Sequence, residues 1–183
     1  MPALPRLDAP RSDGQVALRE WSDDDVEAMI APLNEGEIAR WTRVPSPYRR
    51  EHAEEFVARM GAARRVGEEL ALAIVGAADG QLLGSISIRI TSWEHRRGEL
   101  GYLVFAHARG RGAAPRAARL MARFAFEELG LRRVGIIAAV DNVASQRVAE
   151  KAGFTREGVL RAYLDSPGEG LDMVSFSLLA SDA

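Results

Sequence analysis

Three strand-like segments in the middle of the chain, followed by a helix and a further strand, restrict the fold more than any other feature. The three segments are rich in apolar and β-branched residues and cover residues 70–75, 82–90 and 99–104. The pair Asp79-Gly80 between the first two is a strong hairpin signal. Residues 111–129 then carry an apolar stripe at helical spacing, and residues 134–140 have the pattern of another strand. This order predicts an antiparallel meander joined to a parallel strand–helix–strand crossover, which is a mixed α/β sheet.

The first third of the chain has the pattern of one strand followed by helices. The strand covers residues 16–19, and Ser22, which three aspartates follow, resembles the N-cap of a helix that runs to about Ile30. A short helical stretch carries Trp41, and a longer one covers residues 49–65. We therefore expect two or three helices before the meander.

The last third adds a helix and a pair of strands. The helix covers residues 143–152, and the strands cover residues 154–164 and 171–179. Because no repeat or linker interrupts the pattern, we expect a single domain over residues 15–183, preceded by a flexible, proline-rich lead-in over residues 1–14.

Composition excludes several kinds of site and partner. The 24 basic and 26 acidic residues nearly balance, which argues against nucleic acid or a membrane as the partner of the whole surface. The chain has no cysteine and only three histidines, so we expect no disulfide, no thiolate nucleophile and no metal site. No apolar run has the length of a membrane span or a signal core, and the sequence predicts a cytoplasmic protein.

An arginine-rich turn between a strand and a helix indicates an anion site. No acid lies between Glu99 and Glu127, whereas five arginines do. Free backbone N–H groups and the positive end of the helix dipole converge on such a turn, and small residues let an anion touch the backbone. Pro115 fits the first helical turn because its missing N–H has no partner there. The sequence predicts a phosphate site formed by Arg109, Gly110, Arg111, Gly112, Ala113 and Ala114.

Other phosphate motifs fit this turn less well. The dinucleotide fingerprint GxGxxG would need glycine where Pro115 stands, and a P-loop needs a lysine, of which the chain has only Lys151. A single Arg-Gly-Arg-Gly is weak as an RNA-binding segment, since such segments normally repeat and stay disordered. From the turn alone, a basic helix start without a ligand remains open.

The turn resembles the acyl-coenzyme A loop of the GCN5-related N-acetyltransferases (GNAT), [Q/R]xxGx[G/A], at Arg109, Gly112 and Ala114. A second match is Asn142-x-x-Ser145, followed by Val-Ala-Glu-Lys-Ala-Gly-Phe over residues 148–154, and is similar to the Rim-type branch that acetylates ribosomal-protein N-termini. The resemblance implies a mostly antiparallel central sheet, flanked by helices, whose fourth and fifth main strands splay apart to admit the cofactor. The activity it implies is acyl transfer from acetyl-CoA, or another acyl-CoA, to an amine.

The resemblance also implies roles for particular residues toward coenzyme A. The backbone of Leu103, Val104 and Phe105 would pair with the pantetheine amides like an added strand. The turn from Arg109 to Ala114 would hold the pyrophosphate. Asn142 would bond the pantetheine arm, because an amide side chain offers both a donor and an acceptor. A helix N-cap is the other interpretation of Asn142, and both can hold.

Direct transfer requires a neutral amine, a stabilised oxyanion and a proton for the leaving thiolate. Relatives place a glutamate at the position of Glu99, which is our candidate base, acting through water; a solvated strand-end acid is the alternative. Ser145 resembles the serine that this branch positions near the sulfur, although a first-turn serine often bonds backbone instead. Tyr163 is the rival acid, since other branches use a tyrosine in this region.

The acceptor side is defined less sharply by the sequence. Trp41, Tyr48 and Trp93 lie in regions that cover the amine in relatives, and packing roles explain them equally well. A peptide α-amine, with a pKa near 8, is easier to deprotonate than a lysine, but a small-molecule amine and a longer acyl donor stay open. A CoA-sensing or nucleic-acid-binding module on the same fold is the alternative function, and a homodimer is compatible with either.

Overall fold

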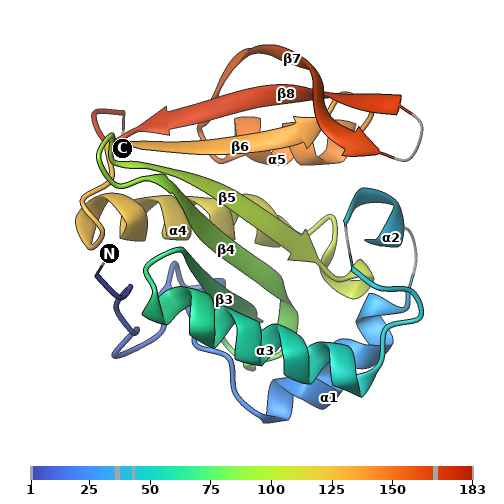
Figure 1. The fold of residues 1–183 in the computed structure, drawn as a ribbon. Coiled ribbons are helices and arrows are strands. Elements are labelled where there is room, and N and C mark those ends of the chain that lie inside the picture. The colour runs from blue at the N-terminus through green and yellow to red at the C-terminus, as the bar shows by residue number, and fades with distance from the viewer. Residues whose placement is uncertain (1, 36–37, 43, 167–168, 183) are drawn as a thin grey trace.

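One eight-stranded mixed sheet organises the protein (Figure 1), which a computed structural model describes over residues 2–35, 38–42, 44–166 and 169–182. The strands lie in the order β1-β2-β3-β4-β5-β6-β8-β7. Their bounds are β1 Arg11–Ser12, β2 Val16–Arg19, β3 Glu69–Gly76, β4 Leu82–Ser92, β5 Arg97–Val104, β6 Arg133–Ala139, β7 Thr155–Ser166 and β8 Glu169–Leu179. The predicted strands of the meander, the crossover and the closing pair are all confirmed.

All neighbouring strands are antiparallel except β5 and β6, which are parallel. This confirms the predicted fold class, a mostly antiparallel sheet with one parallel pair. The closing hairpin is inserted so that β8, not β7, pairs with β6. Part of the turn between these strands, residues 167–168, lies outside the described residues.

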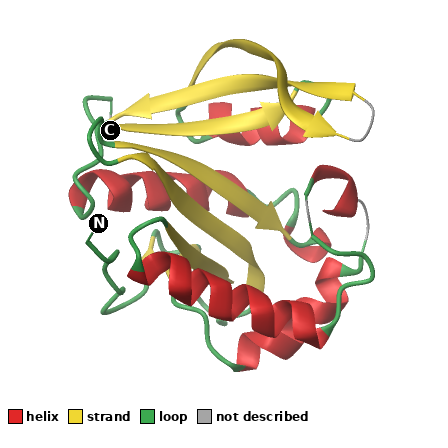
Figure 2. Ribbon diagram, in the orientation of Figure 1, coloured by secondary structure: helices red, strands yellow, loops and turns green. Residues whose placement is uncertain are grey.

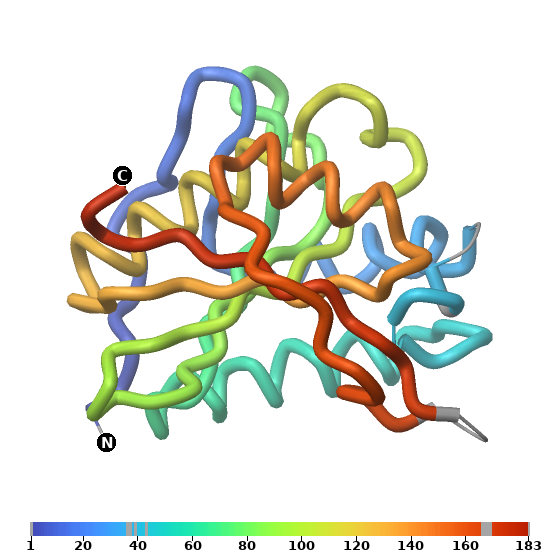
Figure 3. Tube along the Cα trace, turned by 90° about the horizontal axis from the view of Figure 1, so that it is seen from above, coloured from blue at the N-terminus to red at the C-terminus, as the bar shows by residue number. Residues whose placement is uncertain are grey.

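Helices cover both faces of this sheet (Figure 2). The helical elements are α1 Asp24–Leu33, α2 Ile38–Trp41, α3 Arg50–Arg65, the short 3₁₀ helix η1 Ala106–Ala108, α4 Ala113–Glu127 and α5 Val143–Lys151. Helices α4 and α5 lie on one face, and α1 and α3 lie on the other (Figure 1 and Figure 3). No helix within the described ranges is long and apolar enough to cross a membrane.

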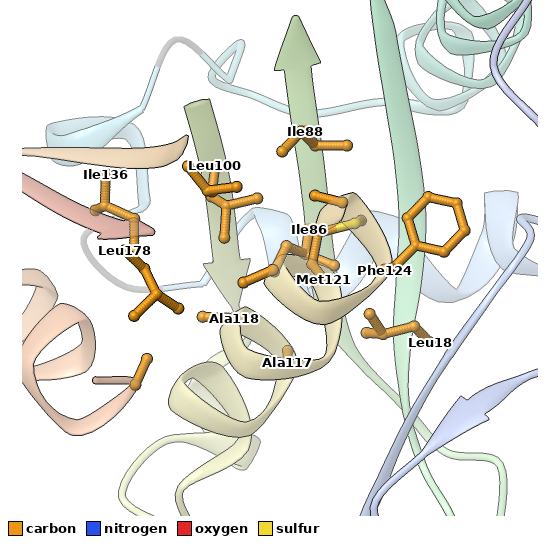
Figure 4. Packing of buried hydrophobic residues seen from close by; sticks show 14 of the residues in the cluster. Leu18, Ile86, Ile88, Leu100, Ala117, Ala118, Met121, Phe124, Ile136 and Leu178 are labelled. Carbon is orange, nitrogen blue, oxygen red and sulfur yellow. The ribbon is translucent and has the colours of Figure 1, made fainter. Parts of the chain in front are cut away.

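The main core lies between α4 and the sheet (Figure 4). Ala117, Ala118 and Met121 of α4 are fully buried against inward side chains of the sheet such as Ile86 and Leu100. The small alanines let the helix approach the sheet closely, and burial of this apolar surface is the main stabilising contribution. The packing fixes the start of α4 relative to the end of β5, which is where the predicted anion turn lies.

Three features of the first 33 residues differ from the predictions. Within residues 2–14, Leu4 is buried and residues 11–12 pair with β2, so these parts of the predicted lead-in pack on the domain, while most of its other residues are exposed. Ser22 is not the acceptor that caps α1. Asp25 instead accepts hydrogen bonds from the N–H and hydroxyl of Ser22 and pairs with Arg19 at 2.6 Å. The helix then continues to Leu33, past the expected end, with Pro32 inside its last turn.

A partly exposed ion pair between β6 and the closing hairpin gives a pH-dependent contribution to stability. Arg133 donates to Glu157, and Ser177 adds a hydrogen bond at 2.9 Å. The Arg133 hydrogen bond chiefly lowers the pKa of Glu157, to about 2. A lowered carboxyl pKa means that the pair stabilises the fold above the unfolded pKa and that this contribution disappears as pH falls through about 2.

We expect Glu157→Gln to lower the free energy of unfolding at pH 7 by about 1 kcal/mol, a figure reduced by solvent screening of a partly exposed pair. Urea unfolding at several pH values measures this, and the difference from wild type should shrink between pH 5 and pH 2. Glu150→Gln is the control, because Glu150 is exposed on α5 and has no partner among the described residues. A difference that stays constant down to pH 2 would contradict the assignment.

Candidate active site

The parallel strands β5 and β6 pair only along their first halves. Their register runs from Arg97 opposite Arg133 to Leu100 opposite Ile136, after which the two strands diverge (Figure 1). β5 continues on β4 as far as Val104. Because the N–H of Phe105 donates to Leu83 on the β4 side, alternation turns the backbone groups of Val104 toward the gap. Beyond Leu100 this edge of β5 pairs with no described strand, although the Val104 carbonyl accepts from Arg109 Nε, and an amide-containing chain can add onto it.

The turn at the end of β5 forms a cradle of free backbone N–H groups. Gly110 and Gly112 have φ angles of 75° and 77°, in the left-handed region that glycine tolerates best. Within the described chain, no residue accepts a hydrogen bond from the N–H groups of residues 110–114. A Cβ built on Gly112 would meet only the Arg116 Nε, at 3.9 Å. The turn is therefore open to an anion, and the α4 dipole favours one there.

Four of the five arginines predicted around this turn have partners among the described residues. Arg109 Nε donates to the Val104 carbonyl at 3.2 Å, and Arg116 pairs with Asp13 at 2.8 Å. Arg119 and Arg123 bond the Lys151 carbonyl and Glu127. Arg111 is exposed and has no partner within the described ranges, which makes it the arginine most available to a phosphate.

Asn142 caps α5 on the far side of the gap. Its Oδ1 accepts a hydrogen bond from the Ser145 N–H at 3.0 Å, so the N-cap interpretation of Asn142 is confirmed. The side-chain NH₂ group has no partner in the described part of the chain. The cap leaves this amide one unused donor, and the predicted ligand contact is compatible with it.

Ser145 meets a tyrosine that the sequence did not single out as a functional residue. The Tyr102 hydroxyl of β5 lies 2.9 Å from Ser145 Oγ and 3.0 Å from the Ser145 carbonyl oxygen. Burial raises the pKa of Tyr102 to about 12, so the phenol stays protonated at neutral pH. Tyr102 therefore links β5 to the start of α5 across the strands that diverge. The sequence feature that could have identified Tyr102 is its position on β5, three residues after Glu99 and therefore on the inward face.

Glu99 lies on the opposite face of β5 from Tyr102. The two faces are distinguished by packing, since Tyr102 and Val104 join the α4 core whereas Leu103 and Phe105 pack with α1 and α3. Alternation places Glu99 on the α1/α3 face with Leu103. There it accepts a hydrogen bond from Arg89 of β4 at 2.7 Å.

Tyr163 lies in the same neighbourhood as this ion pair. The pKa of Arg89 is raised, first by the hydrogen bond to Glu99 and also by the nearby Glu69 and Tyr163. Tyr163 is exposed on β7, next to Ala162, whose N–H bonds Asp172. Of the two candidate acids, Tyr163 lies toward the Glu99 side and Ser145 toward the α4 side of the gap.

A pocket of about 500 Å³ opens between α1, α3 and the end of β5. Tyr48 is one of its wall residues, as the sequence analysis expected of an acceptor site. Trp41 and Trp93 do not line it: Trp41 is exposed on α2, and Trp93 packs on the main core with its indole N–H bonded to the Gly67 carbonyl. The sequence missed Trp21 and Phe56, which also line the pocket, because the helical spacing of Phe56 resembles ordinary core packing and Trp21 lies between elements, where no local period marks it.

A strand edge beside a diverging parallel strand, with an anion cradle at the following helix, is the arrangement that the resemblance implies for a transferase that binds an acyl-coenzyme A. Comparison with known proteins agrees: residues 15–155 match the acetyltransferase (GNAT) domain. The chain belongs to this family and is an acetyl-CoA-dependent N-acetyltransferase. The family recognition and the enzyme class predicted from the motifs are confirmed.

Individual relatives support the same assignment. YoaA of Bacillus subtilis, an uncharacterized N-acetyltransferase, is 28% identical over 165 residues, which are 90% of this chain and 93% of YoaA. YdaF of the same species, a candidate ribosomal N-acetyltransferase, is 42% identical over 101 residues, 55% of each chain. The structure of RimJ from Mycobacterium smegmatis in complex with CoA-disulfide shares the fold, with a TM-score of 0.79 at 23% identity, over 94% of this chain and 87% of RimJ. The resemblance to the Rim-type branch is thereby confirmed.

Proposed function

We propose that the protein transfers an acetyl group directly from acetyl-CoA to a primary amine, with the two substrates reaching the β5–β6 gap from opposite faces of the sheet. One observation carries this proposal. The cradle at residues 110–114 precedes α4, whereas Glu99 and the pocket lie on the α1/α3 face. A thioester in the gap is then accessible to an amine without displacing the coenzyme.

The coenzyme would use the free polar groups around the gap. Backbone N–H groups of residues 110–114 and the side chain of Arg111 would hold the pyrophosphate, since charge-assisted bonds to phosphate are strong. Of the predicted residues Leu103, Val104 and Phe105, Val104 has backbone groups that face the gap, and its N–H would pair with the pantetheine arm, because the Phe105 N–H already donates to Leu83 on the β4 side. The side-chain NH₂ of Asn142 would donate to it from the α5 side.

In the transfer itself, the neutral amine nitrogen attacks the thioester carbonyl and the C–S bond breaks. Glu99 would accept the amine proton, through a water molecule, and Ser145 would donate a proton to the departing thiolate. Tyr102 would position Ser145, since its hydroxyl lies within hydrogen-bond distance of both the Oγ and the carbonyl oxygen of Ser145. Tyr163 is the rival proton donor in this proposal.

The acceptor is a primary amine of low basicity in this proposal, because deprotonating an α-amine near neutral pH costs little free energy. Relatives carry different acceptor names: besides YdaF, the spermidine N(1)-acetyltransferase of Escherichia coli (strain K12) is 30% identical over 82 residues. The names of these relatives therefore leave peptide α-amines and small-molecule amines both as candidate acceptors.

The two functions of Asn142 can be separated by substitution. Asn142→Ser keeps a good N-cap but removes the amide donor, so we expect wild-type thermal stability and a KM for acetyl-CoA about 10-fold higher. Asn142→Ala should show the same rise in KM and also lose about 1 kcal/mol of stability. If Asn142→Ser has the wild-type KM, Asn142 is only a cap.

Thiol release tests the proposed function. Acetyl-CoA mixed with a panel of primary amines should yield free coenzyme A only in the presence of both an amine and the enzyme. The alternative, a nucleic-acid-binding module, is tested by competition: RNA should fail to displace coenzyme A at physiological salt. Displacement by RNA without any turnover would favour the alternative.

A further inference from the structure

The walls of the α1/α3 pocket are apolar and aromatic. Trp21 and Phe56 meet edge to face, with ring centroids 5.5 Å apart, and Tyr48 and Phe105 are buried beside them. The volume of about 500 Å³ lies in the range of small-molecule sites and far exceeds what the methyl group of an N-terminal alanine would fill. Such walls favour an aromatic or bulky apolar group.

Charge around the pocket does not favour a polycation. Among the residues that the structure describes, the charged ones that line it are Glu55 and Arg59, both on α3, which balance in formal charge. His52 accepts a hydrogen bond at Nδ1 from the Arg49 N–H, so this nitrogen carries no proton. A polyamine would have to bury its distal ammonium groups among aromatic rings with no excess of carboxylates, which is costly.

The pocket reaches the gap at its sheet end. Ser85 and Leu103, which face each other across β4 and β5, form part of its wall, and Leu103 follows the point at which β6 separates. The next pair on the same face is Ser87 and Gly101, about 7 Å nearer to Glu99. An amine held beside Gly101 can therefore keep a ring, two or three bonds away, inside the pocket.

We infer that the acceptor is a primary amine that carries an aromatic group close to the reacting nitrogen, and that this group occupies the α1/α3 pocket. The inference rests on the proposed function and narrows its acceptor class. Two kinds of molecule carry an aromatic group this close to a primary amine: a free arylalkylamine and a peptide whose first residue is aromatic. It disfavours a peptide beginning with alanine or serine, and it disfavours spermidine.

The walls hold one buried polar group that an acceptor can bond. The Trp21 indole N–H is buried, and the described residues provide no hydrogen-bond acceptor for it. The Ser85 hydroxyl likewise has no partner within the described chain. Because the Ser85 hydroxyl makes no hydrogen bond within the described chain, replacing this side chain tests the pocket without breaking a side-chain hydrogen bond of the fold.

The first experiment compares kcat/KM, with acetyl-CoA as donor, for 2-phenylethylamine, tryptamine, a phenylalanyl peptide, an alanyl peptide, ethylamine and spermidine. We expect the aromatic amines to exceed ethylamine and the alanyl peptide by about 10- to 100-fold, the gain from burying one aromatic ring. Comparing kcat/KM for the phenylalanyl peptide with kcat/KM for the free aromatic amines shows which of these two kinds of acceptor the enzyme prefers. If spermidine or the alanyl peptide is preferred, the inference is wrong while the proposed function stands; if no amine releases thiol, the proposed function itself fails.

The second experiment fills the pocket. Ser85→Phe should lower kcat/KM for the preferred aromatic amine by at least about 10-fold and leave ethylamine within about threefold of wild type. Ser85→Ala is the matched control, since it removes the same hydroxyl without filling space, and it should behave like wild type. Thermal unfolding and calorimetric binding of coenzyme A verify that Ser85→Phe is folded.

A pocket that holds a long acyl chain instead would give a different pattern. Wild type would then prefer hexanoyl-CoA to acetyl-CoA, Ser85→Phe would reverse that preference, and aromatic amines would match ethylamine. That result, or equal loss of aromatic and small amines in a folded Ser85→Phe variant, would overturn the inference.

Discussion

Gly112→Val is expected to weaken coenzyme A binding by about 100-fold while the protein remains folded. Gly112 has a φ of 77°, which valine disfavours, and its missing Cβ leaves the cradle before α4 open. A branched side chain there would keep the pyrophosphate from the backbone N–H groups. Losing one or two charge-assisted hydrogen bonds, at about 1.5–3 kcal/mol each, accounts for this factor.

Calorimetric titration with coenzyme A and with pantetheine measures this effect, because pantetheine lacks the phosphates. The variant should lose affinity for coenzyme A while its affinity for pantetheine changes little. Gly130→Val is the matched control: Gly130 also has a positive φ, 63°, and open space, but it lies beyond the other end of α4. Both variants should have a free energy of unfolding lowered by a similar amount, and only Gly112→Val should lose affinity for coenzyme A. Wild-type affinity in Gly112→Val would place the anion site elsewhere.

Glu99→Gln is expected to lower kcat/KM by about 100-fold at neutral pH, the usual contribution of a general base. The loss should diminish as pH rises past the pKa of the acceptor amine, because the amine then needs no base. Affinity for acetyl-CoA should stay unchanged. The pH–rate profiles of wild type and variant measure both effects.

The ion pair with Arg89 requires a control, since Glu99→Gln also removes a cross-strand contact of about 0.2–1 kcal/mol. Arg89→Gln removes the same contact and keeps the carboxylate, so it should retain most of the activity. Ser145→Ala should lower kcat without recovery at high pH. If Arg89→Gln is as impaired as Glu99→Gln, the pair is structural and Glu99 is not the base.

The sequence predicts most elements of this fold because the hydrophobic period identifies them locally. The meander, the helix after the anion turn and the parallel crossover follow from such local signals. The insertion of β8 between β6 and β7 did not follow, because strand order depends on long-range pairing that no local period encodes. The burial of Leu4 was missed for the same reason, since its contacts lie far along the chain.

The site divides in a similar way. The glycines before α4 and the cap at Asn142 could be predicted, because backbone conformation and capping depend on neighbouring residues. The contact of Tyr102 with Ser145 and the pairing of Glu99 with Arg89 depend on register, which the sequence does not specify. The pocket is the part of the site that local sequence patterns predict least, because Trp21, just before α1, meets Phe56 of α3 only when the two helices pack together.

A single-turnover measurement tests the central claim most directly. Enzyme is mixed with an equal amount of acetyl-CoA and an excess of one amine, either 2-phenylethylamine or an alanyl peptide. In each sample, the amount of coenzyme A released should equal the amount of acetylated amine formed, and the two products should appear at the same rate. Free thiol and the acetylated product are followed in the same sample, by thiol titration and mass spectrometry. Thiol without acetylated amine, or coenzyme A binding with no turnover on any amine, would contradict direct N-acetyl transfer.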